Sequence, residues 1–461
     1  MFMKRHGKLI FPVVIGIFII GTTFTSRNEV NAKSGVSRNF ASRNEANVKS
    51  GVIRNIIFLI GDGMGVSFTS GYRYYKDDPA TIELEPTEFG PYLVGQQTTF
   101  PNDPKFNITD SAAAATAMAT GVKTYNGAIG VDKDHSKLKS VLETAKEKGK
   151  GTGLVATAPI THGTPAAFGA HVTQRESMAV IADAYYQDLV SGKHKIDVML
   201  GGGSDWFIRK DRNLVEEFVK DGFSYVNNLE ELKNDQNRQV LGLFAKDGLP
   251  KMIDRTKNIP SLADMTISAI ERLNMNDKGF FLMVEGSQID WEAHDNDIVG
   301  AMSEMEDFEK AFKVAIDFAK KDGHTLVIAT ADHSTGGYTI GARGQYNWFS
   351  SVIKAVKRSP DYMAMKIVKG ADVKETLTKY IDLPLTQDEI KSVEKAARTK
   401  KEKNIDTAIE EIINHRSFTG WTTDGHTGED VNVYAYGPGS KRFQGQIDNT
   451  DHAKIIFDIL K

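Results

Sequence analysis

The 461-residue chain contains no cysteine. A disulfide framework, a thiol nucleophile, a cysteine-ligated zinc finger, an iron–sulfur cluster and a lipid-modified N-terminal cysteine are therefore all excluded. Any transition metal must be held by histidine and carboxylate side chains. The chain also lacks a basic excess, with 57 basic and 60 acidic side chains, which argues against a nucleic-acid-binding module. The remaining composition, 40% hydrophobic and 25% charged, is that of an ordinary globular protein.

The N-terminus has the pattern of an export signal. Three basic residues precede the apolar run Leu9–Phe24, which Pro12 and two glycines interrupt and which is short for a membrane span. Small residues at Val30 and Ala32 fit a signal-peptidase site. We expect residues 1–32 to be a signal peptide, and the product to be secreted, or cell-surface or periplasmic, with no stable membrane span after cleavage. An uncleaved signal anchor is the alternative.

A tandem duplication follows the apolar run. The sequence of Ser26–Ala41 recurs with few changes as Ser42–Ile57. Two short copies cannot stack into a solenoid core. We therefore interpret residues 33–53 as a duplicated flexible linker or pro-region without chemistry, and residues 54–461 as a single catalytic domain.

The body of the chain alternates apolar, β-branched runs with helical stretches. This rhythm predicts an α/β fold with a mostly parallel central sheet and helices on both faces. Ligands of such sheets bind at the carboxyl ends of the strands. The expected strands are Asn55–Ile60, Thr152–Ala156, Ile196–Leu200, Phe280–Glu285, Thr325–Ala331 and Val431–Tyr436, and the expected helices include Leu138–Lys148, Glu176–Val190, Leu262–Leu273 and Ile298–Lys321.

Residues 344–420 depart from this rhythm. The segment is rich in lysine and glutamate, and Thr386 and Glu389 have the spacing of a capping box that begins a helix. We expect a charged helical insertion within the catalytic domain. Its basic run could bind an anionic partner such as a wall polymer, but interleaved glutamates favour a solvated helix face.

Polar residues follow several of the expected strands. Asp62 follows the first, and Asp332 and His333 follow the strand that ends at Ala331. Asp290 and His294, four residues apart, share one face of a helix. Each pattern alone is unremarkable, since a surface pair or a turn residue would explain it.

Together these residues indicate metal binding. With His426, which precedes the last strand, they form six Asp and His groups, enough for two ions with three protein ligands each. Histidine and aspartate ligands favour zinc, whereas the oxygen ligands Glu285 and Thr164 suit magnesium better.

Ser111 begins an alanine-rich stretch that favours a helix. Asp110 or Ser111 could serve only as the N-cap of this helix. The alternative is a nucleophile, because backbone N–H groups at a helix N-terminus attract phosphate and a nearby metal can activate the hydroxyl.

Six motifs in order along the chain resemble the signature blocks of bacterial alkaline phosphatases, most closely the secreted Bacillus type. They are Gly61–Gly65, Thr109–Ala113, Thr120–Thr124, Val284–Gly286, Ala331–His333 and His426–Gly428. The resemblance implies hydrolysis of phosphate monoesters through a phosphoserine intermediate, with two Zn²⁺ ions and one Mg²⁺ ion as cofactors.

The resemblance also implies individual roles. Ser111 would be the nucleophile, and Arg175 would bind two phosphate oxygens. The first zinc would take Asp290, His294 and His426, and the second would take Asp62, Asp332 and His333. Asp62 would also bridge to magnesium, whose other ligands would be Thr164 and Glu285.

Two positions depart from the enterobacterial form of the family. His162 replaces an aspartate near magnesium, and Trp291 replaces a lysine near phosphate. His162 either alters the metal preference of the third site, whose metal is therefore uncertain, or lies beside the site without touching metal.

Other readings stay open. Related phosphodiesterases, phosphonate hydrolases, sulfatases and phosphoglycerate mutases share this fold and metal pair, and an exported zinc- or phosphate-binding protein without turnover is conceivable. The family is commonly dimeric, so a homodimer is an open alternative for which the sequence shows no interface.

Overall fold

The computed structural model describes residues 52–78 and 80–461, which belong to one compact unit. The expected signal peptide, 1–32, and residues 33–51 of the expected linker lie outside the described residues. Within the described part of the chain, no helix combines the length and apolar character needed to cross a bilayer.

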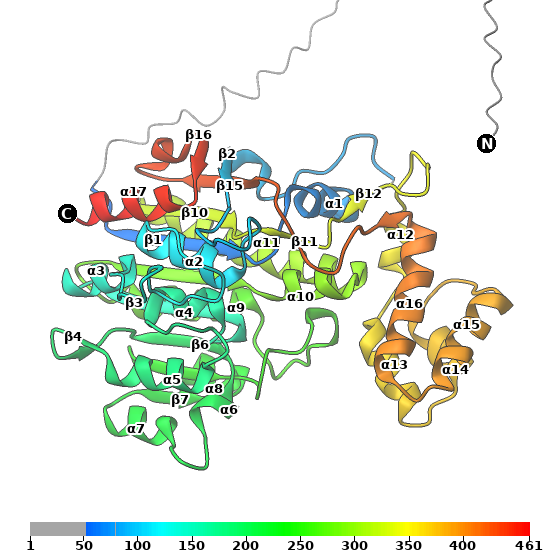
Figure 1. The fold of residues 1–461 in the computed structure, drawn as a ribbon, viewed down its shortest axis with the longest axis horizontal. Coiled ribbons are helices and arrows are strands. Elements are labelled where there is room, and N and C mark those ends of the chain that lie inside the picture. The colour runs from blue at the N-terminus through cyan, green and yellow to red at the C-terminus, as the bar shows by residue number, and fades with distance from the viewer. Residues whose placement is uncertain (1–51, 79) are drawn as a thin grey trace, which may run out of the picture. The chain divides into compact units, whose positions relative to one another are not determined.

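The unit is built on a ten-stranded sheet (Figure 1). One strand, β15, runs antiparallel to both of its neighbours, and the other neighbouring strands are parallel. The predicted mostly parallel sheet is therefore confirmed. In spatial order the strands are β16 (Gly445–Asp448), β2 (Leu93–Thr98), β15 (Val431–Tyr436), β10 (Thr325–Ala331), β1 (Asn55–Gly61), β9 (Phe280–Gly286), β3 (Gly151–Pro159), β6 (Val198–Gly202), β8 (Val240–Leu243) and β7 (Ser224–Val226).

All six expected strands are present, although β3 and β6 end later than expected. The sequence pattern misses β2, β16, β7 and β8 for a physical reason. The first two, with sequences LVGQQT and GQID, lack an apolar run, and β7 and β8 have only three and four residues. Strands this short or polar carry little periodic signal.

Both faces of the sheet are buried, as a parallel sheet requires. Along β1, Ile57 and Leu59 pack into one hydrophobic core, while Ile56, Phe58 and Ile60 pack into another. The first core includes side chains of α9 (Leu262–Leu273) and α11 (Ile298–Asp322). The second includes side chains of α2 (Ser111–Thr120), α4 (Gly163–Gly169) and α17 (Thr450–Leu460). Period-two alternation in β1 therefore supplies both cores from one strand.

Helices connect the strands and cover the sheet (Figure 1). Between β1 and β10 along the chain they are α1 (Val66–Lys76), α2 (Ser111–Thr120), α3 (Val141–Glu147), α4 (Gly163–Gly169), α5 (Met178–Gln187), α6 (Ser204–Phe207), α7 (Leu214–Lys220), α8 (Leu229–Asn234), α9 (Leu262–Leu273), α10 (Gln288–Asp295) and α11 (Ile298–Asp322). The C-terminal helix is α17 (Thr450–Leu460).

The segment 344–420 consists mainly of helices that gather at one side of Figure 1. The expected capping box is present, because Thr386 and Glu389 exchange both hydrogen bonds at the start of α15. The helices are α12 (Ser350–Lys354), α13 (Pro360–Val368), α14 (Val373–Tyr380), α15 (Gln387–Ala397) and α16 (Glu402–Ser417).

Two helices are shorter than expected. The helix expected over Leu138–Lys148 is α3, Val141–Glu147. The other is the helix expected over Glu176–Val190. The prediction continues to Val190, but α5 ends at Gln187 and Leu189–Val190 forms strand β4, which pairs with β5 (Lys193–His194). Ser191 and Gly192, both with positive φ, make the turn between the two strands. The pattern of apolar residues alone did not reveal this turn.

Candidate metal and phosphate site

The register of the central strands brings the predicted metal ligands to one edge. Gly61 of β1 pairs with Ala331 of β10 on one side and with Gly286 of β9 on the other. Because all three strands are parallel and end at the same level, the residues that follow them meet. These residues are Asp62, the pair Asp332 and His333, and helix α10.

Asp290, His294 and His426 lie together. One turn of α10 separates the first two, and His294 Nε2 is 3.3 Å from Asp290 Oδ2. His426 belongs to the short strand β14 (His426–Thr427), which pairs with β11 (Ser334–Thr335) next to His333. Its Nε2 is 3.1 Å from His294 Nε2 and 3.6 Å from Asp290 Oδ1.

Asp62, Asp332 and His333 form a second group, in which all three residues are fully buried. His333 Nε2 is 3.5 Å from Asp62 Oδ1 and 3.2 Å from Asp332 Oδ2. The two groups are continuous, because the His333 ring stacks on the His426 ring with centroids 3.6 Å apart. The arrangement therefore places six candidate ligands in two adjoining sets.

A third set contains Asp62, His162 and Glu285, whose ligand atoms all lie within 4.8 Å of one another. Thr164 on α4 is also fully buried, and its hydroxyl is near enough to Glu285 to lower the pKa of that carboxyl group. Burial outweighs this effect and raises the pKa of Glu285 to about 7. His162, which the sequence leaves either on or beside the third site, thus has a nitrogen within reach of both carboxylates.

The pKa values and unpaired oxygens of these acids indicate a site for a cation. Burial raises the pKa of Asp332 to about 6, and burial together with neighbouring carboxylates raises that of Asp62. Several buried oxygens have no hydrogen-bond partner among the described residues: Asp62 Oδ2, Thr164 Oγ1, both Glu285 carboxylate oxygens and Asp332 Oδ2. Buried oxygens of this kind are costly unless something satisfies them, and metal ions would do so.

Ser111 is the first residue of α2 and is only 1% exposed. Asp110, not Ser111, caps the helix, because its carboxylate accepts a hydrogen bond from Ala113 N at 2.9 Å. Ser111 Oγ is thereby free to lie 3.1 Å from His333 Nε2 and 3.4 Å from Asp62 Oδ1. The hydroxyl sits between a helix N-terminus and the second group of candidate ligands.

Arg175 lies beside the start of α2. Its Nη1 donates to Asp110 Oδ2 at 3.0 Å, and its Nη2 donates to His162 Nε2 at 2.9 Å. A Cβ atom at Gly163 would be 3.2 Å from Arg175 Cζ and 3.3 Å from Ala112 N, so the absence of a side chain there lets the guanidinium approach the helix.

Trp291 also borders this region. Its ring makes an edge contact with the His162 ring, with centroids 5.8 Å apart, and it packs against Gly248. The structure therefore places both unusual residues, His162 and Trp291, next to each other.

The sequence does not predict several groups that orient the candidate metal ligands. The carbonyl oxygens of Thr109 and Asp424 accept hydrogen bonds from His426 Nδ1 at 2.8 Å and His294 Nδ1 at 2.5 Å, which leaves the Nε2 atoms directed at Asp290. The Thr335 hydroxyl donates to Asp290 Oδ1 at 2.5 Å. Such contacts fix the rings of metal-binding histidines. Backbone acceptors have no sequence signature, although Thr335 follows Asp332 closely enough to have been considered.

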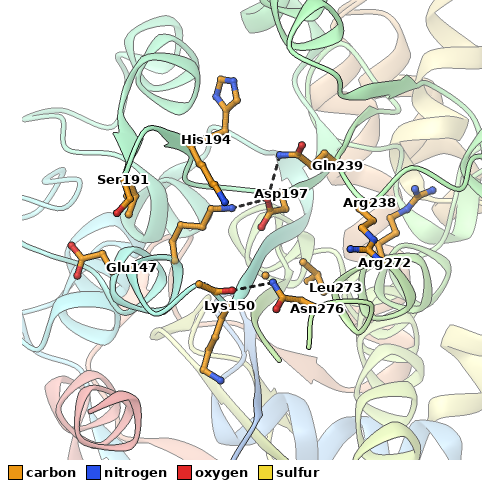
Figure 2. Close-up of a pocket in the computed structure, with 15 residues that line it drawn as sticks. Glu147, Lys150, Ser191, His194, Asp197, Arg238, Gln239, Arg272, Leu273 and Asn276 are labelled. Atoms are coloured by element: carbon orange, nitrogen blue, oxygen red, sulfur yellow. Dashed lines mark hydrogen bonds and ion pairs between the residues drawn. The ribbon is translucent and has the colours of Figure 1, made fainter. Parts of the chain in front are cut away.

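A separate cavity of about 650 Å³ opens at the other end of the strands (Figure 2). It is lined by Gly151, Asp197 and Gln239, which lie at or just before the starts of β3, β6 and β8. Lys146 Nζ and Gln239 Nε2 both contact Asp197 Oδ1 there, at 2.6 and 3.3 Å. This cavity contains none of the predicted site residues.

Comparisons with known proteins identify the family of this chain. Residues 53–461 match the family model described as alkaline phosphatase. Alkaline phosphatase 3 of Bacillus subtilis is 61% identical over 100% of this chain and 98% of its own length, and alkaline phosphatase 4 of the same organism is 60% identical over 88% of each chain.

Solved structures show the same similarity. The cold-active alkaline phosphatase of a psychrophilic Shewanella species has a TM-score of 0.82 at 39% identity, and the match covers 88% of this chain and 100% of that one. The alkaline phosphatase of the Antarctic bacterium TAB5 has a TM-score of 0.65 at 29% identity over 89% and 98% of the two chains. The chain therefore belongs to the alkaline phosphatase family, enzymes that hydrolyse phosphate monoesters.

Proposed function

We propose that this enzyme hydrolyses phosphate monoesters outside the cytoplasm by a metal-dependent reaction in which Ser111 is transiently phosphorylated. The observation that carries the proposal is the position of Ser111 Oγ. It lies 3.1 Å from His333 Nε2 and 3.4 Å from Asp62 Oδ1 at the buried start of α2.

The donor sets support two Zn²⁺ ions and one Mg²⁺ ion. Asp290, His294 and His426 would hold the first zinc, while Asp62, Asp332 and His333 would hold the second. Asp62, Glu285 and Thr164 offer only oxygen and would hold magnesium. His162 would lie beside this ion without binding it, because its Nε2 accepts from Arg175 and its Nδ1 therefore carries the ring proton. When bound, these ions would stabilise negative charge as Lewis acids and lower the pKa of coordinated hydroxyl groups.

Ser111 and the backbone at the start of α2 would have different roles in the reaction. Oγ of Ser111 attacks phosphorus as the bond to the departing oxygen breaks; the serine proton passes to water, and the departing oxygen takes up a proton from water to leave as the alcohol. Water then attacks the phosphoserine, which restores the Ser111 hydroxyl and releases inorganic phosphate. Backbone N–H groups at the start of α2 point toward the negative charge that builds on the phosphoryl oxygens.

Arg175 would donate hydrogen bonds to two phosphoryl oxygens from its planar guanidinium group. Asp110 and His162 hold this side chain at the helix start, so it needs little reorganisation when substrate binds. Trp291, which lines the same region, would shape the approach to phosphate without adding a charge.

Two measurements on the purified enzyme test the proposal. Rates with p-nitrophenyl phosphate and bis-p-nitrophenyl phosphate should differ strongly in favour of the monoester, and faster diester cleavage would contradict it. Metal analysis with activity before and after chelation should show zinc and magnesium whose removal abolishes turnover. Activity indifferent to chelation would exclude the metal-based mechanism.

We further propose that residues 1–32 are a cleaved signal peptide, that 33–53 are a linker, and that 54–461 are one catalytic domain with a helical insertion around 344–420. Mass spectrometry of the exported protein tests the first point, with an N-terminus after Ala32 expected. Sedimentation analysis decides between a monomer and a homodimer.

A further inference from the structure

Six carboxylates cluster where α10 and α11 meet the helices of the segment 344–420. Two lysines, Lys251 and Lys403, lie among them. Asp295, the last residue of α10, connects this acid cluster to the proposed zinc ligand His294. The carboxylates are Glu292, Asp295, Asp297, Asp361, Asp406 and Glu410.

In one half of the cluster, three carboxylates surround the largely buried lysine Lys251. Lys251 Nζ is 2.5 Å from Glu292 Oε2 and 3.3 Å from Asp297 Oδ2, and it also contacts Asp361. The lysine side chain is only 18% exposed. Burial lowers the pKa of Lys251, but the surrounding carboxylates outweigh it and hold the pKa well above its ordinary value. This half therefore already contains a cation in direct contact with all three of its carboxylates.

The other half is less well supplied with positive charge, because Lys251 reaches only Asp295 there, with Nζ 4.0 Å from Oδ2. Asp295, Asp406 and Glu410 place carboxylate oxygens within 4.8 Å of one another. Asp406 is 1% exposed and Glu410 4%, yet both Asp406 oxygens and Glu410 Oε1 lack a hydrogen-bond partner among the described residues. Buried carboxyl groups without hydrogen-bond partners are costly to the folded state.

The lysine nearest to this half is a weak substitute for a bound cation. Lys403 contacts Asp295, and its Nζ is 3.7 Å from Asp406 Oδ2. Its side chain is 62% exposed, so water competes for its charge and it can turn away at little cost.

We propose that Asp295, Asp406 and Glu410 bind a hard divalent cation, and that Ca²⁺ is the ion that fits. The set offers only carboxylate oxygens, without the nitrogen or sulfur that favours zinc. Ca²⁺ accepts several carboxylates in flexible geometry and completes its shell with water. A cavity of about 600 Å³, lined by Asp295, Glu410 and Lys403, gives water and the ion access.

The protonation behaviour of two of these acids agrees with a cation site. Burial and the charge of Asp361 raise the pKa of Asp406 to about 8, and burial and the charge of Asp406 raise the pKa of Glu410 to about 10. Without a cation these groups retain protons near neutral pH. A bound ion would take the place of those protons.

The ion would link two parts of the fold. Asp406 and Glu410 belong to α16, whereas Asp295 ends the helix that carries Asp290 and His294. Ca²⁺ would therefore fasten the charged helical segment to the helix of the proposed zinc site. Its primary effect would be on stability, because none of the three residues belongs to the proposed catalytic set.

The experiment uses the zinc-loaded enzyme in excess Mg²⁺, so that the other metal sites are filled. Calcium binding is measured by titration calorimetry and by thermal unfolding. The wild type is compared with Asp406→Asn, with Asp406→Asn/Glu410→Gln, and with the control Glu402→Gln, whose carboxylate is exposed on the first turn of the same helix.

We expect one equivalent of Ca²⁺ to bind the wild type and raise its Tm by several degrees. Asp406→Asn should weaken calcium binding at least tenfold and remove most of the Tm shift, and the double variant should remove it fully. Glu402→Gln should behave like the wild type.

Two results would overturn the proposal. One is a wild-type enzyme that takes up no calcium beyond its zinc and magnesium content, a measurement that needs no variant to fold. The other is calcium binding of unchanged affinity in Asp406→Asn. Either result would leave the phosphatase proposal untouched, since p-nitrophenyl phosphate hydrolysis is measured separately in the same samples.

Discussion

Nη2 of Arg175 lies 2.9 Å from Nε2 of His162. A guanidinium group can only donate, so this imidazole nitrogen accepts the hydrogen bond and the ring is neutral. Burial and the charge of Arg175 lower the pKa of His162 to about 3, which agrees with a neutral ring. His162 therefore connects the proposed phosphate-binding arginine to the third set of candidate metal ligands.

Replacing His162 by aspartate should increase the preference of the third site for magnesium. The new carboxylate would lie beside Asp62 and Glu285 and would add an oxygen ligand where the protonated Nδ1 of His162 offers none. We expect the Mg²⁺ concentration for half-maximal activity of the metal-stripped, zinc-reloaded enzyme to fall about tenfold or more. His135→Asp, at an exposed histidine, is the matched control. An unchanged magnesium requirement in His162→Asp would contradict this role.

Asp110 has two functions that can be separated. One oxygen caps α2 through Ala113 N, and the other accepts from both Arg175 Nη1 and Gly127 N. Asparagine can still cap the helix but carries no charge for the arginine. Asp110→Asn should therefore raise KM by about tenfold or more, as expected for loss of a charge-assisted hydrogen bond, while the cap is kept and stability falls only through the lost acceptor of the Gly127 N–H.

Asp110→Ala provides the comparison. It should raise KM similarly and also cost about 1 kcal/mol of stability, because the cap is lost. Steady-state kinetics and urea unfolding of the two variants distinguish the functions. If both variants kept the wild-type KM and only Asp110→Ala lost stability, Asp110 would be only a cap.

Glu143 links the acid stability of the fold to His171. The His171 ring donates from Nε2 to Glu143 Oε1 at 2.9 Å, and its Nδ1 faces the Gly130 carbonyl oxygen at 2.8 Å. Burial raises the pKa of Glu143, but His171 and the Ser140 N–H outweigh it and bring the pKa down to about 2. A carboxyl pKa lowered by folding stabilises the folded state above the unfolded value of ~4.3, and this contribution declines as pH falls through about 2.

Glu143→Gln should thus be less stable than the wild type at pH 6 by ~3 kcal/mol at most, and the gap should shrink between pH ~4.5 and 2. Urea unfolding of metal-free protein measures it without metal release. The exposed neighbour Glu147, changed to glutamine, should show a much smaller pH-dependent gap. A Glu143→Gln deficit that stays constant from pH 6 to pH 2 would show that only the capping box was lost.

The sequence predicts the parts of this fold that have strong periodicity. The buried strands β1, β9 and β10 stand out as apolar runs, and the polar residues that follow them identify the edge where ligands gather. The edge strand β16 and its neighbour β2 do not stand out, since their glutamines and glycines are accommodated by pairing with adjacent strands. Whether such a segment forms a strand depends on its neighbours in the fold, and its local sequence pattern does not predict it.

In the candidate site too, local spacing predicts some of the residues, while contacts between distant segments place the others. Spacing alone indicates that Asp290 and His294 share a helix face. The position of His426 depends on the pairing of β14 with β11, which joins segments about ninety residues apart and has no local signal. The second function of Asp110, beyond capping, likewise depends on Arg175, which a separate segment supplies.

The most direct test of the mechanism is to trap phosphate on the protein. The enzyme is acid-quenched during turnover of p-nitrophenyl phosphate, and the tryptic peptide 106–123 is examined by mass spectrometry. We predict a single phosphate on Ser111, with no phosphopeptide and a loss of activity of at least about a thousandfold in Ser111→Ala. Phosphate on a different residue, or hydrolysis by Ser111→Ala at the wild-type rate, would contradict the proposed nucleophile.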